Sequence, residues 1–186
     1  MAPLPPLPDP PPTDVAVEMA HMATVRAHAE GMATLGTVYQ TMFHAPGVAR
    51  RVGALGDEIR FHGVLPDDVR ELVILRYASR AGFGYEWSHH QRPARLADLD
   101  PATVDAITAG EIPTSLRPEQ QAALAAVDQV IAHRSIPAHV QRVLIDSFGE
   151  AGAVELVVTC GLYAIMGYTV VAFDIATEPQ LPPAPF

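Results

Sequence analysis

RELVILRYA, residues 70–78, is the stretch that decides the fold. It follows Leu65-Pro66-Asp67-Asp68, where turn residues and acids in the first turn are typical of a helix start. Gly82 and Gly84 end the helical pattern on the other side. Because this helix is apolar nearly all round, we expect it to lie at the centre of the fold.

Helix signals continue outward from this stretch in both directions, and strand signals are few. Further helices are expected over 13–44 with interruptions at Gly31 and Gly36, and over 47–61, 85–99, 101–109, 117–133, 136–148 and 149–175. Pro93 should kink the helix that contains it, because its ring crowds the carbonyl of the preceding turn. The sequence therefore predicts an all-α domain of six to eight helices.

Both ends of the chain are rich in proline, which favours extended conformations. We interpret residues 1–13 as an N-terminal arm, 14–176 as one helical domain and 177–186 as a C-terminal tail. Two interpretations of these ends stay open. They are either disordered segments without a role or arms that wrap a neighbouring subunit.

Composition excludes several classes of function. The 186 residues carry a net charge of −9 and contain neither lysine nor asparagine, which removes Schiff-base and P-loop lysine chemistry. An acidic chain without basic clusters is also a poor partner for nucleic acid. The single cysteine, Cys160, cannot form an intramolecular disulfide and fits a reducing cytoplasm. The N-terminus lacks the pattern of a signal peptide.

An uncharged stretch, Leu156 to Phe173, reaches the lower length limit of a membrane span. It contains Gly161, Gly167 and Tyr168, and no arginine flanks it to set an orientation. We therefore expect a helix that is buried inside the protein or between subunits, and no membrane partner. A helix this apolar also favours a homo-oligomer.

Chemistry is concentrated in Tyr85-Glu86-Trp87-Ser88-His89-His90. On a helix, Glu86 lies three residues before His89 and four before His90, so its carboxylate can orient either imidazole. Glu71, in the central apolar helix, would have its pKa raised by burial unless a cation partners it. The alternative is a polar Glu–His pair that only closes a helix junction.

These residues resemble a known family. The runs 70–78 and 85–90, followed by Ala94, are similar to the carboxymuconolactone decarboxylase family, whose all-helical fold is shared with the alkylhydroperoxidase AhpD. The likeness extends to His44-Ala45-Pro46 and Gly161-Leu162-Tyr163 and covers residues 30–176. It implies an AhpD-like fold that assembles as a trimer or hexamer.

The peroxidase branch of this family has a Glu, a Cys twelve residues later, a second Cys three further on and a His four beyond that. Counted from Glu71, these positions hold Phe83, Glu86 and His90. The dithiol is missing, so peroxide reduction by that mechanism is nearly excluded. The remaining Glu, Glu and His set resembles the decarboxylase-like branch, which implies proton transfer.

The resemblance implies a role for each residue of this set. His90 would deliver a proton, Glu86 would orient His90 or act as a second acid, and Glu71 would serve as a base or as a neutral acid. The alternative is that His90 is structural and Glu71 pairs with Arg76 or Arg80. Substrate contacts are predicted for residues of the same region and its neighbours: Tyr85, Trp87, His89, His44, Phe83, Arg76 and Arg80.

The resemblance thus implies a cofactor-independent decarboxylase, isomerase or cyclase that acts on a small lactone-like or carboxylate substrate through an enol or enolate. The chain has eight histidines, but no ligand spacing predicts a metal site, and no glycine-rich fingerprint predicts a nucleotide cofactor. The alternative is a catalytically silent ligand-binding or scaffold protein with the same fold.

Overall fold

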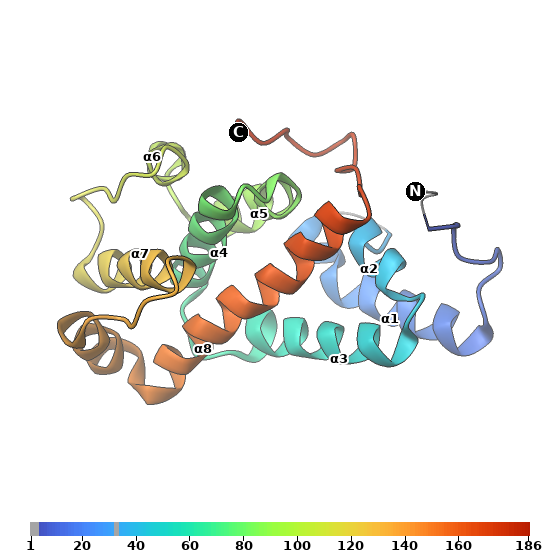
Figure 1. Ribbon diagram of the computed structural model, residues 1–186, viewed down its shortest axis with the longest axis horizontal. Coiled ribbons are helices and arrows are strands. Elements are labelled where there is room, and N and C mark those ends of the chain that lie inside the picture. The colour runs from blue at the N-terminus through green and yellow to red at the C-terminus, as the bar shows by residue number, and fades with distance from the viewer. Residues whose placement is uncertain (1–3, 32–33) are drawn as a thin grey trace.

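A computed structural model describes residues 4–31 and 34–186, and the described part contains helices and no strands. The helices, coloured along the chain in Figure 1, are α1 (Thr13–Glu30), α2 (Thr37–Met42), α3 (Pro46–Asp57), the π-helical turn η1 (Glu58–His62), α4 (Asp67–Ala81), α5 (Gly84–Leu96), α6 (Pro101–Thr108), α7 (Pro118–Ile131) and α8 (Ala138–Ala172). The all-α prediction is confirmed.

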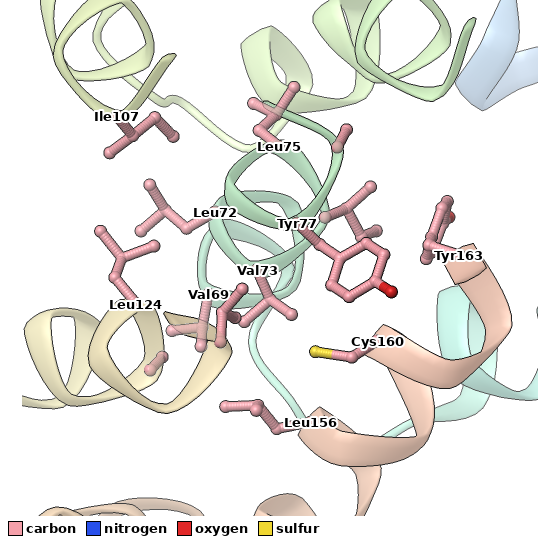
Figure 2. Close-up of a cluster of buried hydrophobic side chains, with 14 of the residues drawn as sticks. Val69, Leu72, Val73, Leu75, Tyr77, Ile107, Leu124, Leu156, Cys160 and Tyr163 are labelled. Carbon is pink, nitrogen blue, oxygen red and sulfur yellow. The ribbon is translucent and has the colours of Figure 1, made fainter. Parts of the chain in front are cut away.

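α4 lies at the centre of the fold, as the sequence predicts. Its residues from Val69 to Ala78 are all buried, and the helix contacts α5, α6, α7 and α8. Figure 2 shows Leu72 facing Ile107 and Leu124 on one side of α4, while Val73 and Tyr77 lie toward Cys160 of α8. Because the middle of α4 is surrounded, the charged side chains there, Arg70, Glu71 and Arg76, are buried.

Two glycines set the ends of the elements around the site. Gly82 closes α4 in the left-handed conformation at φ 72°, which glycine adopts without steric cost, and α5 starts two residues later. Gly149 interrupts α8 at φ 71° and ψ 176°, a region that is essentially restricted to glycine. The two helices predicted over 136–148 and 149–175 are therefore present and meet at this break.

Two further departures from simple helices shape the region near the site. α3 continues without a gap into η1, a π-helical turn that buries Arg60. π-helical turns occur frequently at functional sites. The single segment expected over 13–44 is divided into α1 and α2, with Gly31 left-handed at the end of α1. α5 remains helical through Pro93 to Leu96.

The second half of α8 is apolar but only partly covered. The helix is long and apolar enough to cross a membrane by length and composition, with a mean hydropathy of 1.7, and 39% of that window is buried. Val154, Tyr168 and Val171 are more than 60% exposed. After α8 the C-terminal segment turns back and runs over α5 (Figure 1), where Ala184 lies against Gly84.

Candidate active site

A cavity of about 40 Å³ lies where α2, η1, α5 and α8 meet. Its walls combine one glutamate, one arginine, two histidines and three tyrosines with apolar residues. They are Gly36, Val38, Tyr39, Arg60, Tyr85, Glu86, His89, His90, Leu162, Tyr163 and Met166. Four residues predicted from the sequence, Tyr85, Glu86, His89 and His90, therefore share one cavity.

Glu71, His90 and Tyr163 form a hydrogen-bonded chain beside this cavity. The Nδ1 atom of His90 lies 2.6 Å from Oε2 of Glu71, and its Nε2 atom lies 2.8 Å from the Tyr163 hydroxyl. The other carboxylate oxygen of Glu71 accepts a hydrogen bond of 3.3 Å from Nε of Arg70. α4, α5 and α8 each supply one member, so packing of the three helices fixes the chain.

The pKa shifts of Glu71, His90 and Tyr163 indicate which of these groups carries each proton. Burial alone would raise the pKa of Glu71, but His90, Arg60 and Arg70 outweigh it and hold the pKa below its ordinary value. Burial lowers the pKa of His90 and raises that of Tyr163. At neutral pH Glu71 is therefore ionised and accepts the Nδ1 proton of a neutral His90, while the Tyr163 hydroxyl donates to Nε2. Of the two roles predicted for Glu71, the base therefore fits this environment better than the neutral acid.

Glu86 has the opposite environment. Its side chain is 3% exposed, and among the described residues neither carboxyl oxygen has a hydrogen-bond partner. Burial raises the pKa of Glu86 to about 8, so the carboxyl is protonated at neutral pH. The prediction that Glu86 orients His90 is wrong, because Glu71 and Tyr163 occupy both imidazole nitrogens. Glu86 instead has the properties of the predicted second acid.

The two arginines predicted to bind substrate lie elsewhere. Arg76 makes a two-pronged ion pair with Asp128 of α7, with contacts of 2.9 and 2.7 Å, and also bonds the backbone carbonyls of Ile107 and Glu111. Arg80 lies 3.5 Å from the same aspartate. Neither arginine lines the cavity, and neither pairs with Glu71, because both connect α4 to α7.

Phe83, Trp87 and His44 are also outside the cavity. Phe83 packs in the core between Tyr77 and Tyr168, with ring centroids 6.2 and 5.6 Å away. The indole of Trp87 donates to the Thr108 hydroxyl at 2.9 Å, facing α6. His44 is exposed and lines a separate surface groove beside the N-terminal segment. None of these three predicted substrate contacts therefore lines the cavity that contains Glu86.

Tyr85 and His89 line the cavity and contact a residue from the C-terminal segment. Nε2 of His89 lies 2.8 Å from Oε2 of Glu178, and the Tyr85 hydroxyl lies 3.1 Å from Oε1 of the same carboxylate. The two rings stack at a centroid distance of 4.3 Å. His89 is thus a largely buried residue of the cavity wall, and it pairs with Glu178.

Three residues of the site have no predicted role in the sequence. Tyr163 belongs to the Gly161-Leu162-Tyr163 segment that carries the resemblance, so this position was noticed without its chemistry. Arg60 lies inside an ordinary helical pattern, and only the π-helical turn brings it to the cavity. Glu178 is the single acid of the tail 177–186, which is the one signal that singles it out.

Two other kinds of reactive site, a cysteine thiolate and a metal-ligand group, can be compared with the described residues. Cys160 is 1% exposed, and burial raises its pKa to about 12, so it is not a reactive thiolate. Over residues 4–31 and 34–186, no three His, Cys, Asp or Glu side chains come together as a metal-ligand set.

We next compared the sequence with family models and with curated protein sequences. Residues 46–129 match the model of the carboxymuconolactone decarboxylase family, a range that contains Glu71, Glu86 and His90. No curated protein sequence matches the chain closely enough to count as a relative.

Solved structures share the architecture over most of the chain at low sequence identity. The debrominase Bmp8 in complex with 2,3,4-tribromopyrrole is 18% identical, with a TM-score of 0.75 over 90% of this chain and 89% of that chain. A peroxidase-related AhpD core protein from Ralstonia eutropha is 18% identical, with a TM-score of 0.74 over 94% and 88%. Residues 46–129 are thus similar to the carboxymuconolactone decarboxylase family, and most of the chain has the AhpD-like fold.

Proposed function

We propose that this protein is a cofactor-independent acid–base enzyme that forms and protonates the enol or enolate of a small lactone-like or carboxylate-bearing molecule. The observation that carries this proposal is Glu86, an unpartnered carboxyl in the wall of a cavity that also contains His90 and Tyr163. A buried polar group without a partner costs stability, so its retention beside titratable groups favours a chemical role.

In a decarboxylation, the bond between the substrate carbon and its carboxylate breaks, and the electron pair enters an extended enolate as CO₂ leaves. The neutral Glu86 carboxyl then donates its proton to the enolate carbon. The hydroxyl of Tyr163 donates to Nε2 of His90 before substrate binds, and it can donate to the enolate oxygen after its O–H turns from Nε2 toward the substrate. Glu86 regains its proton from water before the next turnover.

The same groups can run an isomerisation or a ring opening. The Tyr163 oxygen accepts a proton from a substrate carbon while its own proton passes to Nε2 of His90, and Glu86 protonates a second atom. After the product leaves, His90 releases its extra proton to water and the Glu86 carboxylate takes one up from water, which restores both groups. The ionised Glu71 at Nδ1 stabilises the imidazolium that forms. Glu71 therefore acts as a positioning residue, whereas Tyr163 and Glu86 are proposed to touch the substrate.

Turnover assays test this proposal. Purified protein is incubated with carboxymuconolactone and, separately, in deuterium oxide with a panel of small keto and lactone acids, and CO₂ release and carbon-bound deuterium are measured. The wild type should act on at least one compound, and Glu86→Gln should lose about 10²–10⁴-fold in rate, the range of general acid catalysis. Activity should persist after exhaustive chelation. Equal rates in wild type and Glu86→Gln would contradict the proposal.

A silent ligand-binding or scaffold protein is the second candidate. It is favoured by the small volume of the cavity, about 40 Å³, and by the mutual hydrogen bonds of Glu71, His90 and Tyr163. This candidate predicts tight retention of a small molecule without conversion. Native mass spectrometry of the purified protein, followed by product analysis across pH, separates binding from turnover.

We also propose that the protein is a homo-oligomer, a trimer or hexamer, in which further copies cover the apolar side of α8. The proposal is supported by the exposed side chains there, which include Val154, Val157, Ile165, Tyr168 and Val171. Monomers rarely expose a contiguous apolar patch of this kind. Light scattering should report the oligomer, and a stable monomer would contradict it.

A further inference from the structure

The carboxylate of Glu178 is held by four donors from two helices. Its Oε1 atom accepts hydrogen bonds from the Thr37 backbone N–H at 2.9 Å, the Thr37 hydroxyl at 2.8 Å and the Tyr85 hydroxyl at 3.1 Å. Its Oε2 atom lies 2.8 Å from Nε2 of His89. We call Thr37, Tyr85 and His89 the carboxylate cradle.

The carboxylate cradle stabilises an anion. Burial would raise the pKa of Glu178, but the hydrogen bonds from His89 and Thr37 outweigh it and lower the pKa to about 2. The donors therefore favour an ionised carboxylate over the neutral acid. Any carboxylate that reaches the same position can accept the same bonds, because the donors recognise the functional group and not the chain that carries it.

The carboxylate cradle is also part of the cavity. Tyr85 and His89 line the same cavity as Glu86 and His90, and Oε1 of Glu178 lies 3.8 Å from the position of a β-carbon on Gly36, another wall residue. A cavity of about 40 Å³ holds little more than a water molecule, whereas ligand sites usually measure about 300–1,000 Å³. A ring-sized substrate therefore requires a wall to move.

The segment that carries Glu178 lies against the wall residues Tyr85 and His89 and has no regular secondary structure. The chain after Phe173 contains no helix, whereas the cavity residues Tyr85, Glu86 and Tyr163 lie within long helices. Beyond Glu178, the segment is held by Ala184 against Gly84 and by the edge of Phe186 against Trp87, with ring centroids 6.3 Å apart.

We infer that Thr37, Tyr85 and His89 form the subsite for the carboxylate of the substrate, and that Glu178 occupies it until a substrate carboxylate displaces it. The inference rests on the proposed function for its substrate class. The inference adds the position at which the substrate carboxylate binds. It also gives the C-terminal segment a role, because its Glu178 competes with the substrate for that position. No covalent step is involved.

Chemical rescue tests the carboxylate cradle without any turnover. Glu178→Ala should melt at a lower temperature than the wild type, and sodium acetate should restore several degrees by binding the empty cradle. Sodium chloride at the same ionic strength should not. Wild type and the control variant Glu150→Gln, an exposed acid on α8, should show no difference between the two salts. The absence of an acetate effect in Glu178→Ala would overturn the inference.

Direct binding tests the exchange. Calorimetric titration of the full chain with 2-furoate and with the uncharged 2-furamide compares a carboxylate with an amide of the same ring. Glu178→Ala should bind 2-furoate at least tenfold more tightly than the wild type does, and adding Thr37→Val or His89→Gln should remove that gain. 2-Furamide affinity should not change. If Glu178→Ala does not fold, Glu178→Gln carries the same comparison.

Three results would overturn the inference: unchanged 2-furoate affinity in the Glu178 variants, an equal gain for 2-furamide, or a gain that survives loss of Thr37 and His89. Failure of the proposed function is a separate outcome. If Glu86→Gln has no effect on turnover while 2-furoate binds as described, the subsite stands and the acid–base mechanism is wrong.

Discussion

Two buried glutamates lie on neighbouring helices beside one cavity and have opposite environments. Glu71 of α4 bonds His90 and Arg70 through its two oxygens, and its pKa is lowered. Glu86 of α5 has no hydrogen-bond partner among the described residues, and burial raises its pKa to about 8. The difference teaches that burial alone does not fix the charge of a carboxyl, and that partners decide whether it is a fixed anion or a neutral acid.

The largest expected effect is the loss of turnover when Glu86, the neutral carboxyl, is replaced. Glu86→Gln keeps the shape of the side chain but has no proton to donate, so it should reduce kcat by about 10²–10⁴-fold without lowering the melting temperature. Steady-state kinetics and thermal unfolding of the same preparation check this. A Glu86→Gln enzyme of normal activity would remove the difference in function between the two glutamates.

The second prediction concerns stability, where replacing Glu71 should have a larger effect than replacing Glu86. Glu71→Leu leaves Nδ1 of His90 buried without a partner and removes one of the two carboxylates that pair with Arg70, which keeps Asp67, and it should cost about 3 kcal/mol of unfolding free energy. Glu86→Leu replaces an unpartnered polar group by an apolar one and should be neutral or stabilising. Urea denaturation of both variants measures the difference. A larger loss for Glu86→Leu than for Glu71→Leu would contradict the assignment of partners.

The pH dependence of stability should carry the signature of Glu86. Because its folded-state pKa of about 8 exceeds the ordinary value of 4.5, its contribution is complete below pH 4.5 and is lost as the pH rises through 8. Between pH 5 and 8 the free energy of unfolding should fall by about 3 kcal/mol from this group. In Glu86→Gln this decline should be absent, whereas a decline of the same size in both proteins would assign it to other groups.

Glu178 should titrate in the opposite direction. Its pKa is lowered from 4.5 to about 2, so the stability it contributes is present above pH 4.5 and is lost as the pH falls toward 2. The effect should be smaller than that of Glu86, because Glu178 is nearer to solvent. Acid unfolding of the wild type and Glu178→Gln is the comparison, and identical acid midpoints would show that the carboxylate cradle does not favour the ionised form.

The sequence was sufficient for the fold because the decisive signals are local. The apolar run 70–78 predicts a central helix, and Gly82 and Gly149 predict its end and the break in α8, which the structure confirms. The resemblance also brought Glu71, Glu86 and His90 together correctly in one region. What it missed is the pairing among them.

That pairing depends on distances across helices, which residue spacing does not encode. Glu86 and His90 are four residues apart on one helix, so the local pattern favoured their pairing. In the structure, α4 and α8 approach α5 closely enough for Glu71 and Tyr163 to occupy both nitrogens of His90. Arg76 and Arg80 were predicted for the site because they are near in sequence, but their helix face meets Asp128 of α7.

The charge of Glu86 at neutral pH is the central claim, and carbon-13 NMR of the glutamate side-chain carboxyls tests it directly. Spectra of labelled wild type and Glu86→Gln are recorded from pH 4 to 10. The wild type should contain one carboxyl that titrates near pH 8 and is missing in Glu86→Gln. If every glutamate carboxyl in the wild type is ionised by pH 6, Glu86 is not the neutral acid of this site and the proposed mechanism is wrong.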